Sequence, residues 1–274
     1  MKKLIVVADW VDDSLTRQEI ISALDGFLKD PDDMNVTFVS STPSTIHTSF
    51  LISQIVENEE RYGRPLETVL FENTDPRIQT VAGVENAKGA EFLVAKLKSG
   101  LWLCGPSAGY DFSMVKPKID ELFTYEGLDE GSQFRSRDLY ARVAAHLMDA
   151  MEDELDFTET TANKIPELRG YYICHIDNFG NIKTTITHND FKGKFEYGDT
   201  VKIKIGSVEQ KAKYVSNLFG GTPGELVIYP GSSGHRDNPL LEVSIWRHFT
   251  EANPTTGIHI FNQPRPGMTV QIQK

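Results

Sequence analysis

The chain has 274 residues, of which 39% are hydrophobic and 24% are charged, so it can bury a core and is long enough for two domains. It carries 28 Lys and Arg against 39 Asp and Glu, a net charge of −11. Because phosphate contacts need basic side chains, this balance argues against a surface that binds nucleic acid.

The N-terminal apolar run meets Asp9 too early for a signal peptide, and no stretch of sequence approaches the roughly 18 apolar residues of a membrane span. We therefore expect a cytoplasmic protein with no membrane partner. Cys104 and Cys174 lie in apolar, strand-like contexts. Both are expected to be reduced thiols packed in a core.

Strand and helix patterns alternate at the start of the chain. The expected strands span residues 4–10, 35–41 and 67–73, and the expected helices begin at Ser14 and Ser44, which can act as N-caps. This order of elements predicts a mainly parallel sheet with helices on both faces.

A hairpin and a long helix complete the first half. Residues 91–106 predict two strands that turn at Ser99 and Gly100, and residues 134–157 have apolar side chains at helical spacing. His146 in this helix has no second ligand at metal-binding spacing. We expect it on the helix surface or satisfied within the fold, and we expect no metal site.

The second half of the chain has a different pattern. Residues 158–169 are polar and are the expected linker between a domain at 1–157 and a domain at 170–274. Beyond the linker, helical periodicity disappears and short strand-like runs alternate with glycine and proline. The sequence therefore predicts an α/β domain followed by a small all-β barrel.

Two acids follow predicted strands of the first domain: Asp9 follows the first strand and Asp75 follows the third. Ligands of α/β sheets bind at the carboxyl ends of strands, where loops and helix N-termini meet. An acid in such a place is often only a helix cap or a turn former. Two acids at the same edge make a ligand-binding role and a purely local role equally good interpretations.

Residues 175–185 contain a loop with more chemistry than a turn needs. The loop can be a simple hairpin turn, because Asn and Gly tolerate positive φ. That alternative does not account for an aromatic residue, Phe179, at its tip. Asp177, Phe179 and Asn181 together offer an anionic acceptor, a stacking face and a carboxamide that can read a purine edge. They suit an adenine-bearing, positively charged ligand.

Two glycine-rich segments follow. Ser232 and Ser233 stand between glycines, where hydroxyls and backbone amides can wrap a carboxylate, although most such turns do nothing of the kind. Residues 217–225 lack the Lys-Ser/Thr pair and the helix of a phosphate-binding loop. We interpret that segment as a connection between strands.

Taken together, these motifs resemble the S-adenosyl-L-methionine (SAM) hydrolase family, also called SAM hydroxide adenosyltransferases, whose relatives include fluorinase and chlorinase. The family's I-D-x-F-G-N motif stands at residues 176–181, its S-S-G turn at 232–234 and its L-E-V strand at 241–243. Residues 133–147 are similar to the family's T-F-H-G-R-D segment and the helix after it. The opening around Asp9 resembles the T-D-F-G start.

The resemblance implies an N-terminal α/β domain, a C-terminal β-barrel, and a homotrimer that binds SAM between one subunit's N-domain and its neighbour's C-domain. The implied reaction is displacement at ribose C5′ by water, which yields adenosine and L-methionine. SAM would be the substrate, and no cofactor is expected.

By resemblance, the substrate-binding residues are Asp9, Asp13, Ser14, Ser136, Asp177, Phe179, Asn181, Ser232 and Ser233. Asp9 would hold the ribose hydroxyls and Asp177 the methionine ammonium. Phe179 and Asn181 would hold the adenine end, and the S-S-G turn would hold the methionine carboxylate.

The family activates water with an Asp, an Arg and a His, and this chain departs from that set. Asp75 is kept, Arg135 stands where the His is expected, and Arg77 is the candidate replacement for the missing Arg. Arg135 cannot act as a base, because its guanidinium stays protonated, but it can pair with Asp75 or steady an anionic nucleophile. Ser136 stands where the fluorinating relatives also have serine.

The departures leave several functions open. The leading hypothesis is a SAM hydrolase, because the ligand-holding loops are kept. The alternatives are a SAM or adenosine-binding protein whose catalytic set has decayed, a SAM adenosyltransferase that uses halide, and a trimer with no nucleoside ligand.

Overall fold

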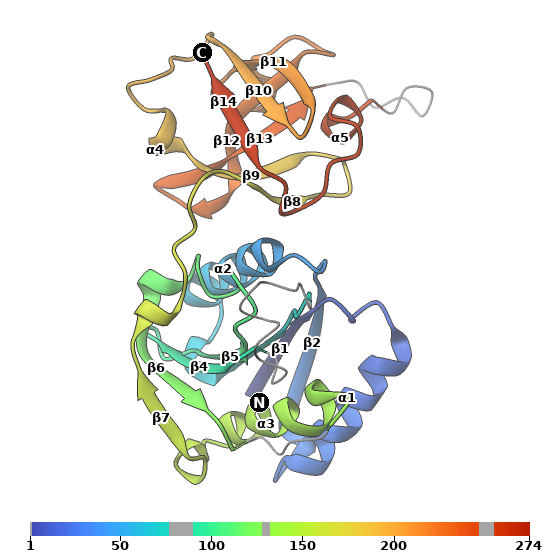
Figure 1. Ribbon diagram of the computed structural model, residues 1–274, viewed down its shortest axis with the longest axis vertical. Helices are drawn as coiled ribbons and strands as arrows, with labels where there is room; N and C mark the ends of the chain where they lie inside the picture. Colours follow the sequence, from blue (N-terminus) through green and yellow to red (C-terminus); the bar gives the residue numbers. More distant parts are fainter. Residues whose placement is uncertain (1, 77–89, 128–131, 247–254) are drawn as a thin grey trace. The chain divides into compact units, whose positions relative to one another are not determined.

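The computed structural model describes residues 2–76, 90–127, 132–246 and 255–274 (Figure 1). The chain divides into two compact units, Met1–Leu168 and Arg169–Lys274, and each is described by itself. In the described ranges, no helix combines the length and the apolar character needed to cross a membrane.

The first unit is built on a seven-stranded sheet in the order β2-β1-β3-β5-β4-β6-β7. Its strands are β1 (Lys2–Ala8), β2 (Met34–Ser40), β3 (Thr68–Asn73), β4 (Phe92–Leu97), β5 (Trp102–Pro106), β6 (Ile119–Tyr125) and β7 (Phe157–Thr160). Strands β2, β1, β3 and β5 run parallel, and β4, β6 and β7 add an antiparallel edge. The predicted α/β domain is confirmed, with this edge as an addition.

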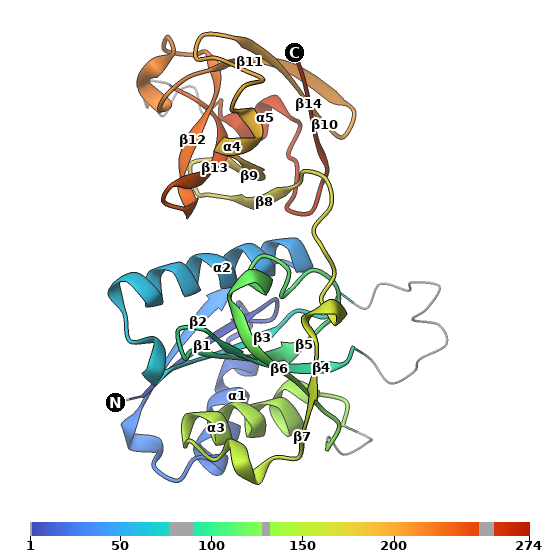
Figure 2. The ribbon, with the colours of Figure 1, turned by 90° about the vertical axis from the view of Figure 1, so that its left-hand side faces the viewer.

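Helices cover both faces of this sheet, as the alternation of elements predicted. Helix α2 (Thr45–Tyr62) lies on one face, and α1 (Ser14–Phe27) and α3 (Ala141–Met148) lie side by side on the other (Figure 2). The apolar run of β1 is buried on both sides: Leu4 packs with α1 and α3, while Ile5 packs with α2. A strand covered on both faces needs such a continuous apolar run.

The predicted hairpin is present. Strands β4 and β5 pair antiparallel, with Lys96 opposite Trp102, and the turn uses Gly100 at φ 85°. The expectation that Ser14 caps the first helix is wrong by one residue. Asp13 is the cap, because its carboxylate accepts hydrogen bonds from the backbone amides of Leu15 and Thr16, at 2.9 and 3.5 Å.

The long helix predicted over residues 134–157 is interrupted. A π-helical turn, η4 (Ser136–Tyr140), precedes α3, and a 3₁₀ turn, η5 (Glu152–Glu154), follows it. The helix ends because Ala150 adopts a positive φ of 54°. Strand β7 then starts at Phe157 and pairs with β6, so the first residues of the predicted linker belong to the first sheet. The remaining 3₁₀ turns of the described chain are η1 (Pro31–Asp33), η2 (Pro65–Glu67), η3 (Lys116–Lys118), η6 (Ala162–Lys164) and η7 (Leu218–Gly220).

The second unit is a curled seven-stranded sheet in the order β14-β10-β11-β12-β13-β9-β8. Its elements are β8 (Ile173–Ile176), β9 (Ile182–Thr187), α4 (His188–Phe191), β10 (Thr200–Ile205), β11 (Val208–Tyr214), β12 (Leu226–His235), β13 (Asn238–Ile245), α5 (Gly257–Ile260) and β14 (Val270–Gln273). All neighbouring strands pair antiparallel except β11 and β12. The predicted all-β domain is confirmed.

The two edges of this second sheet come together. Tyr172, just before β8, forms a bridge with Thr269, just before β14, and the backbone amide of Ile173 donates to the carbonyl of Met268 at 2.8 Å. These contacts curl the sheet towards a closed barrel, which leaves few free strand edges.

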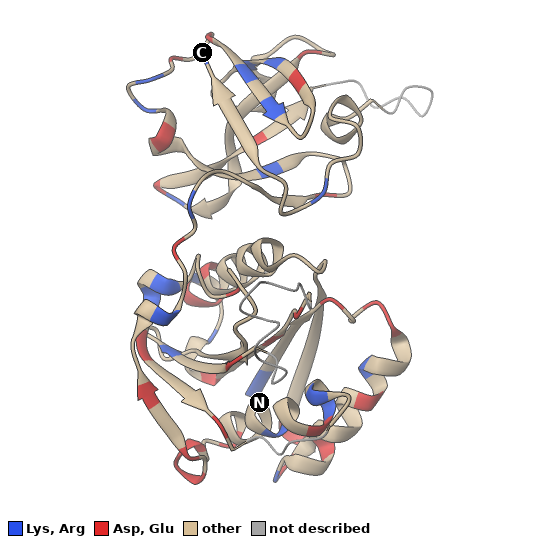
Figure 3. Cartoon of the chain, viewed as in Figure 1, with Lys and Arg blue, Asp and Glu red and all other residues tan. Residues whose placement is uncertain are grey.

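The predictions for isolated residues also hold. Cys104 and Cys174 are free thiols buried in the two units. The Nδ1 atom of His146 lies 2.9 Å from the carbonyl oxygen of Arg142 in its own helix, so the helix itself satisfies this histidine. In Figure 3, Asp and Glu positions are spread over the first unit, for example on α1 and β7, in line with the net charge of −11.

Candidate ligand-binding site

A cleft with a volume of about 680 Å³ opens in the first unit, beside the carboxyl ends of β1 and β3. It is lined by Asp9, Trp10, Asn73, Asp75, Pro106, Ser132, Gln133, Phe134, Arg135, Ser136 and Tyr140. Four residues predicted from the sequence therefore share one cleft: Asp9, Asp75, Arg135 and Ser136. Arg77, the other catalytic candidate, lies outside the described residues.

The parallel pairing of β1 and β3 brings the two acids to this cleft. Ala8 pairs with Asn73 in register, so Asp9 and Asp75 leave the sheet at the same edge. Asp13 and Ser14 are not among the described residues that line the cleft. The hydrogen bond from the backbone amide of Leu15 is the main reason that the pKa of the Asp13 carboxyl is lowered. This bond is the one expected of a helix cap.

Aromatic side chains form one wall of the cleft, and the sequence analysis did not anticipate them. The rings of Trp10 and Phe134 meet edge to face, with their centroids 6.4 Å apart. The indole nitrogen of Trp10 donates to Asn73 Oδ1 at 3.3 Å, which ties this wall to the end of β3. The only signal in the sequence was the position of Trp10 directly after Asp9.

The third side of the cleft comes from the π-helical turn before α3. Ser136 is the first residue of this turn and is buried, Tyr140 is its last, and Arg135 is its N-cap. Burial raises the pKa of Tyr140, and a hydrogen bond from Arg135 opposes that rise. A π turn at the start of a helix is a feature often found at functional sites.

A chain of buried hydroxyls supports the cleft from behind. Ser41 Oγ lies 2.7 Å from Thr48 Oγ1, which donates to Thr74 Oγ1 at 2.7 Å. Ser41 follows β2, Thr48 lies in the first turns of α2, and Thr74 precedes Asp75. These hydrogen-bonded hydroxyls therefore link three elements and hold Thr74, the residue next to Asp75, in place.

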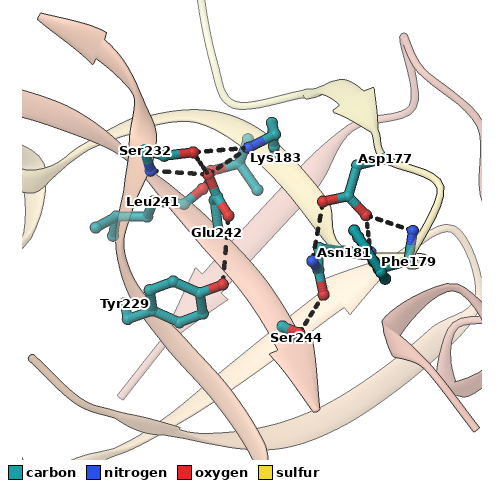
Figure 4. Close-up of polar contacts among 10 residues, drawn as sticks. Asp177, Phe179, Asn181, Lys183, Tyr229, Ser232, Leu241, Glu242 and Ser244 are labelled. Atoms are coloured by element: carbon teal, nitrogen blue, oxygen red, sulfur yellow. Dashed lines mark hydrogen bonds and ion pairs between the residues drawn. The ribbon is translucent and has the colours of Figure 1, made fainter. Parts of the chain in front are cut away.

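The loop with the I-D-x-F-G-N motif lies in the second unit and is held by its own side chains (Figure 4). Asp177 Oδ1 accepts hydrogen bonds from the backbone amides of Phe179 and Asn181, at 2.9 and 3.0 Å, and Asp177 Oδ2 accepts one from Asn181 Nδ2 at 2.9 Å. Asn181 Oδ1 in turn accepts from Ser244 Oγ. Asp177 and Asn181 therefore shape the loop, and the Phe179 side chain is left 64% exposed at its tip.

Gly180 lets this loop pack closely against the segment at α5. It has φ 74°, and a Cβ atom at this position would lie 2.4 Å from Thr256 Oγ1 and 2.8 Å from Ile258 Cγ2. Its carbonyl oxygen accepts a hydrogen bond from the backbone amide of Ile258 at 3.1 Å. Glycine is therefore required here by both conformation and space.

The S-S-G turn is built around a buried glutamate (Figure 4). Glu242, 4% exposed, accepts from the Ser232 amide at 3.0 Å and from Tyr229 Oη at 3.3 Å, and it forms an ion pair with Lys183 at 2.5 Å. The Ser232 amide, expected to be free for a ligand carboxylate, is thus used within the protein. Ser233 is buried. The cation beside this turn is Lys183 of β9, whose Nζ lies 3.3 Å from Ser232 Oγ. The sequence analysis missed this residue.

Known proteins match this chain in both sequence and fold. Residues 171–237 match the model of the SAM hydroxide adenosyltransferase C-terminal domain. A protein of Methanocaldococcus jannaschii named (R)-S-adenosyl-L-methionine hydrolase is 36% identical over 155 residues. That match covers 51% of this chain and 55% of the relative, so it spans only about half of the relative's length.

Two solved structures have the same fold. An uncharacterized conserved protein from Thermotoga maritima gives a TM-score of 0.70 at 18% identity, over 98% of this chain and 100% of that one. A conserved hypothetical protein from Thermus thermophilus gives 0.64 at 16% identity, over 100% of both chains. The family model and the curated relative confirm the resemblance, seen in the sequence motifs, to the SAM hydrolase (SAM hydroxide adenosyltransferase) family.

Proposed function

We propose that this protein hydrolyses SAM to adenosine and L-methionine. The observation that carries the proposal is the cleft of the first unit that Asp9, Asp75 and Arg135 line together. A cleft with two carboxylates suits a substrate that bears a sulfonium cation, because opposite charges attract strongly where little water is present.

The reaction makes modest demands on the protein. Water attacks C5′ of the ribose, the C5′–S bond breaks, and its electron pair goes to sulfur, which leaves as the neutral thioether of methionine. The attacking water loses one proton, and Asp75 is the carboxylate that would orient the water and accept that proton. Because a sulfonium is a good leaving group, no general acid is needed.

The other residues of the cleft would bind and orient the substrate. Asp9 would accept hydrogen bonds from the ribose hydroxyls, and Arg135 would steady the attacking oxygen as its charge develops. The wall of Trp10 and Phe134 would exclude bulk water, which strengthens each electrostatic contact inside the cleft. In the second unit, the exposed ring of Phe179 would stack on the adenine.

Incubation of the purified protein with SAM tests the proposal directly. Adenosine and methionine, separated by chromatography, should appear in equal amounts. In H₂¹⁸O, the adenosine should carry ¹⁸O at O5′, because water supplies that oxygen. Parallel incubations with chloride and fluoride test the use of halide, which would instead yield a 5′-halogenated adenosine. SAM that stays intact under all conditions would refute the hydrolase.

A SAM or adenosine-binding protein without turnover is the second candidate. The presence of Arg135 in the cleft favours it, since the family places a histidine at this position and an arginine cannot act as a base. Calorimetric titration with SAM and with adenosine distinguishes the candidates. Tight binding of either ligand with no product would support the binding protein.

We also propose a cytoplasmic homotrimer with binding sites at the subunit interfaces, as the family resemblance implies. Light scattering during gel filtration should give three times the chain mass of 30.7 kDa. A monomeric mass would refute the trimer, and cell fractionation tests the location.

A further inference from the structure

Two fully buried acids lie in or after strands that contribute residues to the cleft, β3 and β5, and neither acid has a basic partner among the described ion pairs. The side chains of Glu72 and Asp111 are both 0% exposed. In the described part of the chain, Glu72 Oε1 and Asp111 Oδ1 receive no hydrogen bond. A buried carboxylate oxygen without a donor is costly, so these two atoms need an explanation.

Glu72 stands near the end of β3, in a strand that is otherwise mostly apolar. Its Oε2 atom accepts a hydrogen bond from the backbone amide of Thr74 at 3.2 Å. Its Oε1 atom lies over Gly105 of β5, where a Cβ atom would approach it to 2.4 Å. Glu72 thus braces the backbone just before Asp75 and fills the space that Gly105 leaves on the next strand.

Asp111 lies in the loop after β5, and this loop supplies it with donors. Its Oδ2 atom accepts from the backbone amide of Ala108 at 3.1 Å. The amides of Gly109 and of Asp111 itself also favour the charged form and act to lower its pKa. Asp111 therefore has three amides that stabilise a negative charge, whereas Glu72 has one.

The charges around the pair are mainly negative. Burial is the main reason that the pKa of Glu72 is raised, and the negative charges of Asp111, Asp9 and Asp75 raise this pKa further. Burial also raises the pKa of Asp111, with a further contribution from Asp75.

Two neutral groups and one cation complete the surroundings. Burial raises the pKa of Cys104 of β5 and of Tyr140 of η4, and a negative charge on Glu72 would raise each further. Arg135 bonds to Tyr140 and is the cation on that side of the cleft. The negative charges of Asp9 and Asp75 are therefore what opposes a second negative charge on the pair.

We propose that Glu72 and Asp111 hold one proton between them, with Glu72 as the neutral acid and Asp111 as the anion, and that the protonated pair positions Asp75. The two acids hold the backbone at the ends of β3 and β5, which both contribute residues to the cleft. Loss of the proton would place two repelling charges on side chains that are both fully buried. Only the consequence for Asp75 depends on the proposed function.

Thermal unfolding as a function of pH tests the shared proton without any ligand. Above the ordinary glutamate pKa of about 4.3, the unfolded chain has released this proton and the folded chain keeps it. The folded protein then binds more protons than the unfolded one, so this pair lowers stability as pH rises towards its raised folded pKa. Glu72→Gln removes the dependence, because the amide carries its hydrogens at every pH.

The expected result is a difference that grows with pH. The melting temperature of Glu72→Gln relative to the wild type should rise by about 3 °C or more between pH 5 and pH 8. Glu59→Gln is the matched control, because Glu59 is also buried in this unit but pairs with Lys3 at 2.5 Å. That variant should melt below the wild type at neutral pH. A Glu72→Gln difference that stays constant or falls with pH overturns the proposal.

A second measurement covers the case in which Glu72→Gln does not fold. Infrared spectra of the wild-type protein at pH 7 should contain the C=O band of a protonated carboxyl group, and Asp111→Asn should alter it. Absence of the band in the wild type also overturns the proposal.

Turnover tests the positioning of Asp75. Glu72→Gln should keep KM for SAM and most of kcat, while Glu72→Ala should lose kcat about tenfold or more, because Asp75 is no longer held in place. Equal activity of the two variants would refute the positioning role. If wild-type protein shows the pH effect but no turnover, only the proposed hydrolase fails.

Discussion

Asp177 accepts hydrogen bonds from both nitrogens of Asn181, from the backbone amide at 3.0 Å and from the side-chain amide at 2.9 Å. With the bond from the Phe179 amide, the Asp177 carboxylate has three donors within its own loop. A carboxylate has about four acceptor positions, so about one is left for a ligand. Asp177 can therefore bind an ammonium group only while it also holds the loop.

Asp177→Ala should reduce both stability and ligand affinity. The free energy of unfolding should fall by about 1–3 kcal/mol, because three donors lose their acceptor. Affinity for SAM should fall by about 2 kcal/mol, because the ammonium also loses a charged partner. Asp199→Ala is the control, since Asp199 accepts from the Glu196 amide at 3.0 Å in another loop. Calorimetry should find normal affinity for that variant, and normal affinity in Asp177→Ala would exclude an ammonium contact.

Gly180→Ala should destabilise the protein more than Gly193→Ala does. The two glycines have nearly equal φ, 74° and 77°, but only at Gly180 would a Cβ atom collide with neighbours. Gly193→Ala should cost about 1 kcal/mol for backbone conformation alone. Gly180→Ala should cost about 1–3 kcal/mol more for the collision. Urea unfolding measures both values, and equal losses would show that the loop does not pack tightly against Thr256.

Phe179→Ala should weaken nucleoside binding and leave stability unchanged. The ring is 64% exposed, so its removal opens no cavity. Stacking of a base on an aromatic ring contributes about 1–3 kcal/mol, so the Kd for SAM or adenosine should rise about tenfold. Phe219, 70% exposed in the same unit, provides the control variant Phe219→Ala. An equal effect, or none, in the two variants would exclude stacking by Phe179.

Asp75→Asn should impair turnover more than binding. The amide keeps the size of the side chain but cannot accept a proton from water, so kcat should fall about a hundredfold with little change in KM. Asp120→Asn, on the exposed surface of β6, is the control and should keep both constants. A fully active Asp75→Asn would remove Asp75 from the mechanism.

Local patterns in the sequence were sufficient for the order of the elements. The apolar run of β1, the helix that begins after Ser44 and the hairpin at Gly100 follow from spacing and turn chemistry within a few residues. The boundaries were less accurate. The cap of the first helix is Asp13 and not Ser14 as predicted. The helix predicted over 134–157 ends early, because Ala150 leaves the helical conformation.

By itself, the sequence determined the two-part architecture, the loop at Asp177 and the presence of acids at strand ends, because each depends on neighbouring residues. The tertiary structure confirmed that the two acids share an edge, and it alone decided which other residues join them. Parallel pairing of β1 with β3 brought Asp9 and Asp75 to one edge, and the π-helical turn added Arg135 from a distant segment. The proposed pairing of Glu72 with Asp111 likewise depends on folding, because the two residues are far apart in the sequence and become buried only in the tertiary structure.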